Sequence, residues 1–446
     1  MENGRERLGS RLGFILLSAG CAIGCGNVWK FPWMTGQYGG GGFVLVYLIC
    51  LILLGLPVMT MEFSLGRASQ ASPIKMMAKL QKPGQKWHIY SPFALLGNIA
   101  LMSFYTVVTG WMIYYFVMFL TGNTADLSFG GMISNPGVNV VYMLIAIVLG
   151  FGILTLDLQS GLEKVTKYMM LLLFFLMIIL AVHSATLENA GEGYKFYLLP
   201  DFSKINGQVV VGAMNQAFFT LSLGIGSMAI FGSYIDKDRA LLGESVNVVC
   251  LDTFVALVAG LIMFPACASF GIEVDAGPGL LFNTMATVFN NMNGGRIWGT
   301  LFFLFMVFAA LSTELAVFEN ILAMVRELTG WNRPKGCLVC GLGITLTSIT
   351  TALGYSVFHF QPFAEGTAWL DFWDFIVSTN LLPLGSLTVA LFCTMKAGWG
   401  WDNFVAEANA GKGMKVKDWM KPVFMYVVPI AVILIYVYGL ATFGWK

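Results

Sequence analysis

Charged residues are scarce in this chain of 446 residues. Asp, Glu, Lys and Arg together make up 11% of it, whereas a soluble domain carries about 25%. Hydrophobic residues make up 57%, and a soluble protein of this composition would need an exceptionally large core. We therefore predict that the protein is embedded in a lipid bilayer, which is both its surroundings and its main partner. The formal net charge of +1 provides no basic surface, so nucleic acid is not an expected partner.

Side chains that carry enzyme chemistry are also few. The three histidines lie near the ends of hydrophobic segments, and most of the eight cysteines lie inside apolar runs, where disulfide pairing is not implied. Cys337 and Cys340 form a CxxC motif. No second CxxC or nearby histidine completes a zinc site, so we interpret them as buried small residues. We expect neither an enzyme nor a channel, since the sequence shows no charge ring or selectivity loop.

Long apolar segments are abundant. A membrane-spanning helix needs about 20 mostly apolar residues. The N-terminal sequence lacks a cleavage site of the A-x-A type, so we interpret the first segment as a span and not a signal peptide. We predict an all-α polytopic membrane protein with eleven spans in a single transmembrane domain, residues 1–446. The predicted spans are 11–36, 41–68, 89–120, 137–155, 162–184, 208–234, 243–270, 295–327, 337–353, 366–395 and 420–443.

Lysine and arginine are distributed unevenly between the two sides that these spans define. With the N-terminus in the cytoplasm, most of the 25 basic residues fall on the cytoplasmic side, as the positive-inside rule requires. Only Lys195, Lys204, Arg296 and Lys446 fall outside, and Lys30 lies within the first span. We therefore expect a multi-pass protein of the plasma (cytoplasmic) membrane, with its N-terminus cytoplasmic and its C-terminus outside.

Two predicted spans contain clusters of glycine near the expected bilayer midplane. The first span has GCAIGCGN at 20–27, and the sixth has TLSLGIGS at 220–227. Glycine weakens a helix by about 1 kcal/mol relative to alanine, so we predict unwound backbone at both points. Inside a membrane such backbone is tolerated only where it is buried in protein or lines a cavity. Glycines that bring helices together are the alternative, but interrupted helices at corresponding positions of two five-helix halves indicate a transporter site.

Four segments of the chain resemble the neurotransmitter:sodium symporter family. They are RLGFILLSAGCAIGCGNVWKFPW (11–33), GGGGFVLVYL (39–48), GLPVMTMEFSLGR (55–67) and QAFFTLSLGIGSMAIFGSYI (216–235). The resemblance extends over essentially the whole chain, and eleven spans are typical of its bacterial members. It implies the leucine-transporter-type fold, in which spans 1–5 and 6–10 form an inverted 5+5 repeat with helices 1 and 6 broken.

The resemblance also implies two sodium ions. A Ser-Thr pair in a helix usually bonds its own backbone, so the assignment of the pair in FAALSTELA (308–316) to a sodium site depends on the family. One site would be formed by Gly20, Ile23, Ala309, Ser312 and Thr313. The other would be formed by Ala22, Asn27, Thr220 and Asp252, completed by the substrate carboxylate.

Asp252 departs from the family, which usually has asparagine at this position. Animal relatives bind chloride beside this site. Tyr47, Gln216 and Thr220 match their chloride-binding set, but Ala256 stands where those relatives have a serine. A fixed carboxylate here would supply the negative charge that chloride otherwise brings, so we predict that chloride is not required.

The substrate pocket and two gates are implied in the same way. Monoamine-transporting members carry an aspartate at the position of Gly24, so we expect a substrate with its own carboxylate. The small side chains of Cys25 and Ile225 leave room for a hydrophobic or aromatic side chain. The pocket residues would be Cys21, Ala22, Cys25, Gly26, Leu101, Tyr105, Phe219, Thr220, Ser222, Ile225, Thr313 and Val317. The outer gate would pair Lys30 with Asp371, and the inner gate would comprise Arg5, Glu327 and Tyr234.

Span 5 lacks one feature of the family. It begins at Gly161, but Leu171 stands where the family has the proline that helps this span to unwind. Taken together, the sequence predicts a sodium-coupled secondary active symporter that imports hydrophobic or aromatic L-amino acids by alternating access. A membrane sensor that binds sodium and an amino acid without transporting them would carry the same residues and is the open alternative. The sequence gives no indication of oligomeric state.

Overall fold

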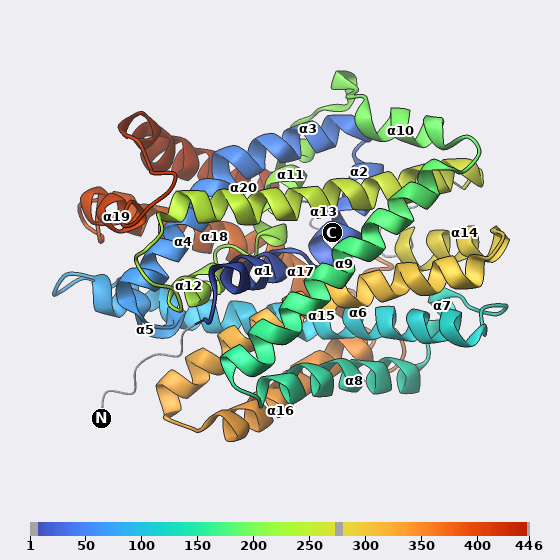
Figure 1. Ribbon diagram of the computed structural model, residues 1–446, viewed down its shortest axis with the longest axis horizontal. Coiled ribbons are helices and arrows are strands. Elements are labelled where there is room, and N and C mark those ends of the chain that lie inside the picture. Colours follow the sequence, from blue (N-terminus) through green and yellow to red (C-terminus); the bar gives the residue numbers. More distant parts are fainter. Residues whose placement is uncertain (1–7, 273–279, 444–446) are drawn as a thin grey trace.

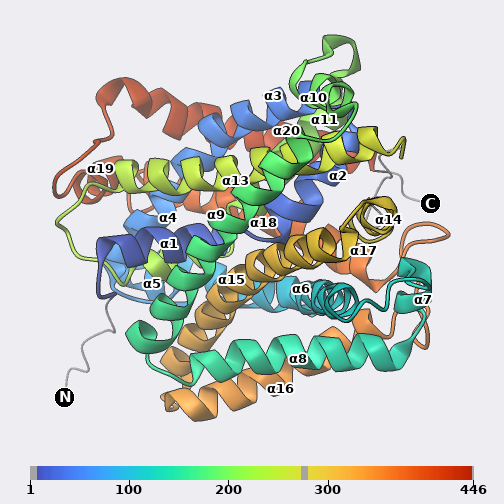
Figure 2. The ribbon, with the colours of Figure 1, turned by 45° about the vertical axis from the view of Figure 1, so that its right-hand side comes forward.

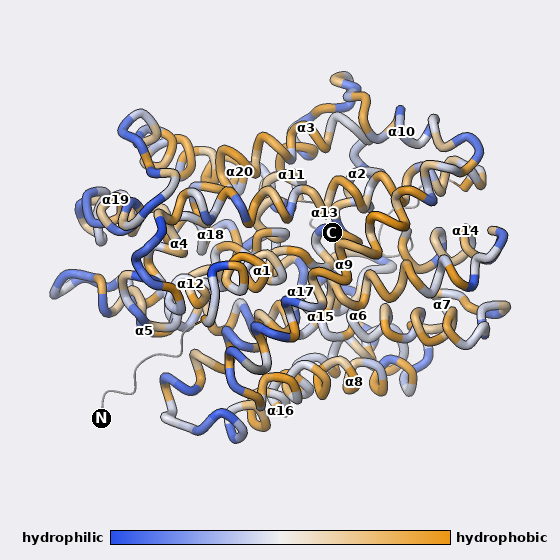
Figure 3. Tube along the Cα trace, in the orientation of Figure 1, coloured by the Kyte–Doolittle hydropathy of each residue, from blue (hydrophilic) through white to orange (hydrophobic). Residues whose placement is uncertain are grey.

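The computed structural model describes residues 8–272 and 280–443, which form a bundle of long helices (Figure 1). Figure 3 shows hydrophobic residues along the middle of the long helices and hydrophilic residues towards both ends of the bundle. This is the distribution expected of helices that cross a bilayer. No strand occurs in these two ranges, and the predicted all-α class is confirmed.

The first half of the chain contains the predicted spans 1–5. Span 1 is interrupted after Ala22, and spans 2 and 5 each include a short π-helix. The elements are α1 (Arg11–Ala22), η1 (Gly26–Lys30), α2 (Phe31–Gln37), α3 (Gly41–Cys50), η2 (Leu51–Gly55), α4 (Leu56–Ser69), α6 (Tyr90–Thr121), α8 (Pro136–Leu154), η4 (Leu158–Glu163) and α9 (Lys164–Ala185).

The second half contains the predicted spans 6–11, and span 6 is interrupted after Thr220. Its elements are α11 (Gly207–Thr220), α12 (Ser227–Gly232), α13 (Leu241–Ser269), α15 (Gly295–Thr329), α16 (Arg333–Ala352), α17 (Trp369–Asp374), η7 (Phe375–Leu381), α18 (Leu382–Thr394), η9 (Val423–Val427) and α20 (Val428–Thr442). The short connecting helices are α5 (Pro73–Leu80), η3 (Trp87–Ile89), α7 (Phe129–Ile133), α10 (Ala190–Leu198), η5 (Phe202–Lys204), η6 (Leu280–Thr284), α14 (Met285–Asn291), α19 (Trp401–Ala408) and η8 (Asp418–Met420).

The helices that could cross a membrane are close in number to the predicted eleven. Among the described residues, nine helical segments are long and apolar enough to cross a membrane, and α1 with η1–α2, bent by 48°, gives a tenth. Helices α11 and α12 occupy the predicted sixth span, with residues 221–226 between them. The chain is thus polytopic, and the count of eleven stays a prediction.

The centre of the bundle is built around α6 and α15. Helix α15 packs against α6, α8 and α9, and α6 also packs against α8 and α16. Figures 1 and 2 show α8 and α16 side by side at one edge of the bundle. Helix α11 packs against α3 and α20. The two interrupted spans also contact each other, α1 with α12 and η1 with α11, so their free backbone groups are shielded from lipid.

Span 5 is not unwound at Leu171, the position where the family has a proline. Helix α9 is continuous from Lys164 to Ala185 and passes through Leu171 without interruption. Gly161 lies in the π-helix η4, directly before α9 begins. The irregular part of span 5 is therefore at its start, where Glu163 accepts hydrogen bonds from the Gly9 amide at 2.8 Å and the Ser10 hydroxyl at 3.0 Å.

Candidate functional site

The break in span 1 exposes the carbonyl groups of a helix end. Helix α1 ends at Ala22, and Ile23 leaves the helical conformation with ψ 97°. The last carbonyls of a helix have no partner within it, so those of Gly20 and Cys21 point away from their own helix. The Tyr105 hydroxyl fixes the turn by accepting a hydrogen bond from the Cys25 amide at 2.9 Å.

These carbonyls meet two hydroxyl groups of α15. The Thr313 hydroxyl lies 3.0 Å from the Gly20 carbonyl oxygen and 3.2 Å from that of Ile23. The Ser312 hydroxyl lies 3.1 Å from the Ile23 oxygen and 2.9 Å from that of Ala309. We call these five residues the α1–α15 oxygen cluster. It is buried and contains only hard oxygen donors, the kind of ligand that an alkali or alkaline-earth cation takes and a soft metal does not.

A second cluster surrounds Asp252 on α13. The Asn27 side-chain amide donates to the Asp252 carboxylate at 2.8 Å and to its backbone carbonyl at 2.9 Å, and the Thr220 hydroxyl donates to the carboxylate at 3.1 Å. The carboxylate is buried, and these partners are neutral. A buried carboxylate is costly without a compensating charge, so this cluster is suited to a cation. Ala22, also expected here, lines the adjacent cavity.

Two further residues of the predicted anion set lie close to Asp252. The Tyr47 hydroxyl lies beside the Asp252 carboxyl and the Thr220 hydroxyl. The Gln216 side-chain amide donates to the Gly26 carbonyl at 2.7 Å, which ties α11 to the broken part of span 1. Ala256 lies buried one turn further along α13. Asp252 thus carries the only carboxylate among Tyr47, Gln216, Thr220, Asp252 and Ala256.

The break in span 6 depends on backbone conformations that glycine favours. Residues 221–226 separate α11 from α12, and Ser222, Gly224 and Gly226 all have positive φ values (51°, 89° and 77°). At Gly224 a Cβ atom would lie 2.2 Å from the Leu382 carbonyl oxygen. Only glycine therefore allows this approach of the break to α18.

Glu62 is a buried acidic residue within the apolar span predicted at 41–68, and backbone amides of span 6 are its partners. Its carboxylate accepts hydrogen bonds from the amides of Gly224 at 2.7 Å and Met228 at 3.2 Å. Asn98 of α6 supports the same break by donating to the Ile225 carbonyl at 2.9 Å. Glu62 thus binds free amides in the break and in the first turn of α12, as an anion at a helix N-terminus does. Its position in an apolar span was the signal that it needed a partner.

A closed cavity lies between the two breaks. Its volume is about 10 Å³, which leaves space for little more than one water molecule. The lining residues that the sequence predicted are Ala22, Gly26, Leu101, Tyr105, Phe219, Ser222 and Thr313. Gly24 and Leu382 also line it and were not predicted. The other predicted pocket residues, Cys21, Cys25, Thr220, Ile225 and Val317, are buried in the surrounding core.

The space around Gly24 excludes any larger residue at this position. A Cβ atom there would lie 2.2 Å from the Thr313 hydroxyl and 2.3 Å from the Tyr105 hydroxyl. An aspartate, which the monoamine-transporting members carry, would therefore displace both hydroxyls. The cavity instead presents apolar side chains and the polar groups of the unwound backbone, an arrangement typical of small-molecule sites.

Lys30, predicted to pair with Asp371 in an outer gate, pairs with a different aspartate in the structure. The Lys30 ammonium lies 2.6 and 2.9 Å from the two carboxylate oxygens of Asp374, not of Asp371, and 3.0 Å from the Ser378 hydroxyl. It also lies 4.3 Å from the centre of the Phe219 ring. Asp371 instead accepts the Ala368 amide at 2.7 Å, at the start of α17. The two aspartates lie one helical turn apart, so Asp374 reaches Lys30 while Asp371 caps the helix.

Replacing Asp374 by asparagine tests this correction. We expect Asp374→Asn to lower uptake about five-fold, which corresponds to roughly 1 kcal/mol, the upper range for a partly exposed ion pair. Asp371→Asn is the matched control: it should lower the thermal stability of the purified protein and leave uptake close to that of the wild type. Uptake and unfolding temperature measured on both variants decide the matter. If only Asp371→Asn lost uptake, the result would support the originally predicted pair of Lys30 with Asp371.

The predicted inner gate is only partly described. Arg5 lies outside the described residues. The Glu327 carboxylate accepts the Ser72 amide at 2.8 Å, and the Tyr234 hydroxyl donates to Glu319 at 3.0 Å. Glu319 also forms an ion pair of 2.6 Å with Arg333. Glu327 and Tyr234 therefore each lie in a polar network, and their role as an inner gate stays a prediction.

Comparisons with known proteins decide the family. A sequence model described as the Sodium:neurotransmitter symporter family matches residues 5–130 and 119–445. The chain belongs to this family. An uncharacterized sodium-dependent transporter of Bacillus subtilis is 34% identical over 438 residues, 96% of each chain. A sodium- and chloride-dependent taurine transporter of Bos taurus is 24% identical over 96% of this chain and 76% of its own length.

A solved structure supports the predicted fold. The crystal structure of MhsT in complex with L-phenylalanine matches with a TM-score of 0.89 and 34% identity, over 97% of this chain and 99% of MhsT. The predicted leucine-transporter-type fold is thereby confirmed. As a member of the family, the chain is a sodium-dependent transporter of the membrane and not an enzyme.

Proposed function

We propose that this chain is a sodium-coupled secondary active symporter that imports hydrophobic or aromatic L-amino acids by alternating access. One observation carries the proposal. The Thr313 side chain belongs to the α1–α15 oxygen cluster and also lines the closed cavity. A cation bound to the cluster and a substrate in the cavity would therefore share one side chain and one broken helix. Such sharing makes the binding of one depend on the other, which is the thermodynamic basis of coupling.

The substrate class follows from the groups around the cavity. Leu101, Phe219 and Leu382 supply an apolar wall. The unwound backbone around Gly24 and Gly26 supplies polar groups that can hold a carboxylate. MhsT, 34% identical over nearly its whole length, was crystallised with L-phenylalanine. An amino acid with a large apolar side chain satisfies both parts of this cavity better than a small polar one.

The ion requirement follows from the two clusters. We assign one sodium ion to the α1–α15 oxygen cluster and a second to Asn27, Thr220 and Asp252. Asp252 provides the fixed negative charge at the second site, so the transporter should not need chloride. We also place the protein in the plasma membrane with a cytoplasmic N-terminus, because that orientation puts most basic residues inside.

Uptake of labelled amino acids into proteoliposomes tests the function. With an inward sodium gradient in chloride-free buffer, we expect leucine, phenylalanine, tyrosine or tryptophan to accumulate. Replacing sodium by potassium should reduce accumulation to the level of protein-free liposomes. Sodium-dependent binding without accumulation would identify a sensor and contradict the proposal. Accumulation of small polar amino acids alone would contradict the substrate class but not the coupling.

A further inference from the structure

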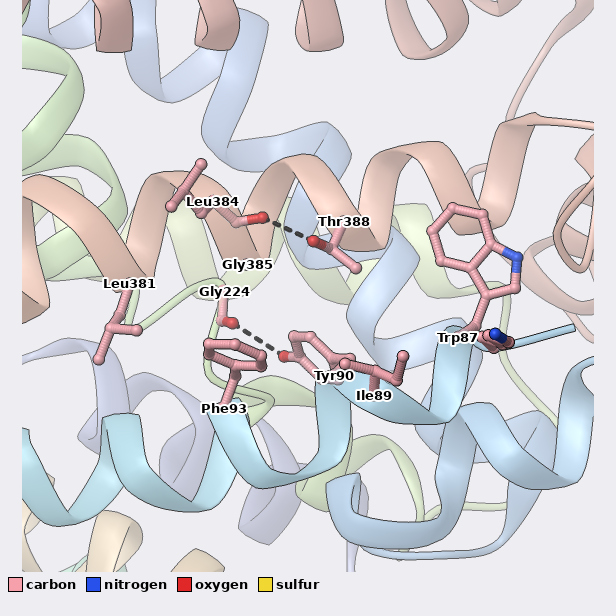
Figure 4. A pocket seen from close by; sticks show the side chains of 10 residues that line it. Trp87, Ile89, Tyr90, Phe93, Gly224, Leu381, Leu384, Gly385 and Thr388 are labelled. Atoms are coloured by element: carbon pink, nitrogen blue, oxygen red, sulfur yellow. Dashed lines mark hydrogen bonds between the residues drawn. The ribbon is translucent and has the colours of Figure 1, made fainter.

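A groove separate from the cavity between the two breaks opens on the surface of two membrane-spanning segments. It has a volume of about 280 Å³ and lies between the start of α6 and α18 (Figure 4). Its walls are mainly apolar, and Ile89, Phe93 and Leu384 on these walls are 53%, 54% and 40% exposed. Figure 4 shows Phe93 and Tyr90 on one side of it and Leu384 and Thr388 on the other. Since both helices cross the membrane, lipid is the medium that this groove faces.

The inner end of the groove is the unwound backbone of span 6. Gly224 lines it, and the Tyr90 hydroxyl donates to the Gly224 carbonyl at 2.8 Å. Gly385 lines it as well, and a Cβ atom at that position would lie 1.8 Å from the Gly224 carbonyl oxygen. Unwound backbone at this depth is tolerated only where it is covered. An apolar chain held in the groove would complete that cover from the lipid side.

One end of the groove is basic. Lys86 lines it, and residues 73–93 contain four lysines and no acidic residue. The segment after α18 meets this end: the Lys82 ammonium donates to the Lys396 carbonyl at 3.1 Å, and the Trp87 ring nitrogen donates to the Ala397 carbonyl at 2.7 Å. Tryptophan beside lysines is typical of the membrane–water interface. The basic end therefore lies at the depth of lipid headgroups.

We propose that the α6–α18 groove binds one anionic phospholipid. An acyl chain lies along Ile89, Phe93 and Leu384, and the phosphate lies at Lys86. The proposal uses both parts of the groove, because its apolar walls suit an acyl chain and the lysine at one end suits a negatively charged headgroup. A zwitterionic phospholipid fits the groove equally well but gains less at the headgroup.

Native mass spectrometry of the full-length protein in detergent tests the site with phosphatidylglycerol and phosphatidylcholine as probes. We expect the wild type to retain one phosphatidylglycerol in preference to phosphatidylcholine. Lys86→Gln should weaken phosphatidylglycerol binding about five-fold, the factor for roughly 1 kcal/mol per basic residue near an anionic surface. Thr388→Trp, which fills the groove, should abolish retention of both lipids. Lys417→Gln changes charge equally outside the groove and should have no effect.

Three results would overturn the proposal. They are equal retention of the two lipids by the wild type, unchanged phosphatidylglycerol retention in both Lys86→Gln and Thr388→Trp, and displacement of the lipid by excess inorganic phosphate, which would indicate a simple anion site. If Thr388→Trp does not give a monodisperse protein, Leu384→Trp fills the same groove and takes its place. Because the readout is lipid binding, the result does not depend on the transport activity proposed above.

Discussion

Replacing Thr313 by valine should weaken sodium activation of uptake roughly 30-fold, the factor for about 2 kcal/mol, which is a typical contribution of a hydrogen-bonding group that interacts with a charge. Valine keeps the shape of threonine and removes only the hydroxyl. That hydroxyl lies within 3.2 Å of three carbonyl oxygens of the broken span 1, those of Gly20, Cys21 and Ile23. The measurement is the sodium concentration that gives half-maximal uptake into proteoliposomes.

Thr313 also lines the cavity, so a second variant separates the ion from the substrate. Ser312→Ala removes a hydroxyl of the same oxygen cluster from a residue that does not line the cavity. It should shift sodium activation in the same direction and leave the apparent substrate affinity at saturating sodium unchanged. Thr345→Val, on α16, removes a hydroxyl that bonds only its own helix and serves as the control. Unchanged sodium activation in both cluster variants would refute the assigned ion site.

The broken helices could be predicted because their cause is local. The glycine clusters at 20–27 and 220–227 lie within single spans, and their effect on helix stability does not depend on the rest of the fold. The structure interrupts the helices at these points, after Ala22 and after Thr220. The residues around the breaks were predicted from the resemblance, which assigns site residues position by position along the chain.

The partners of individual charges could not be predicted in the same way. Asp371 and Asp374 are one helical turn apart, and the choice between them depends on how α17 faces Lys30. Glu62 finds its partners 162 and 166 residues away, in backbone amides that are free only because span 6 is broken. Leu382 enters the cavity from α18, in the predicted span 366–395, to which the resemblance assigned a gate residue and no substrate contact. Each case depends on how a helix is oriented about its own axis relative to its neighbours, and the spacing of residues in the sequence does not determine that orientation.

Replacing Asp252 by asparagine should make transport respond to chloride. Wild-type uptake is expected to be equal with sodium chloride and with sodium gluconate. In Asp252→Asn, uptake without chloride should fall roughly ten-fold or more; a ten-fold change corresponds to about 1.4 kcal/mol, well within the ~4 kcal/mol attraction between unit charges 4 Å apart near a protein surface. The side-chain oxygen of asparagine can still accept from Asn27 and Thr220, so the packing should survive while the charge is lost.

Chloride should restore part of the lost uptake, because Tyr47 and Thr220 keep hydroxyl groups beside the same position. Asp402→Asn makes the same chemical change at an exposed residue of α19 and should leave uptake and its chloride response as in the wild type. Two results would contradict the role of Asp252: a chloride requirement in the wild type, or full uptake by Asp252→Asn in gluconate. Uptake by Asp252→Asn that chloride does not restore would show that the carboxylate is needed as a sodium ligand. Supplying the negative charge with chloride would then not be enough.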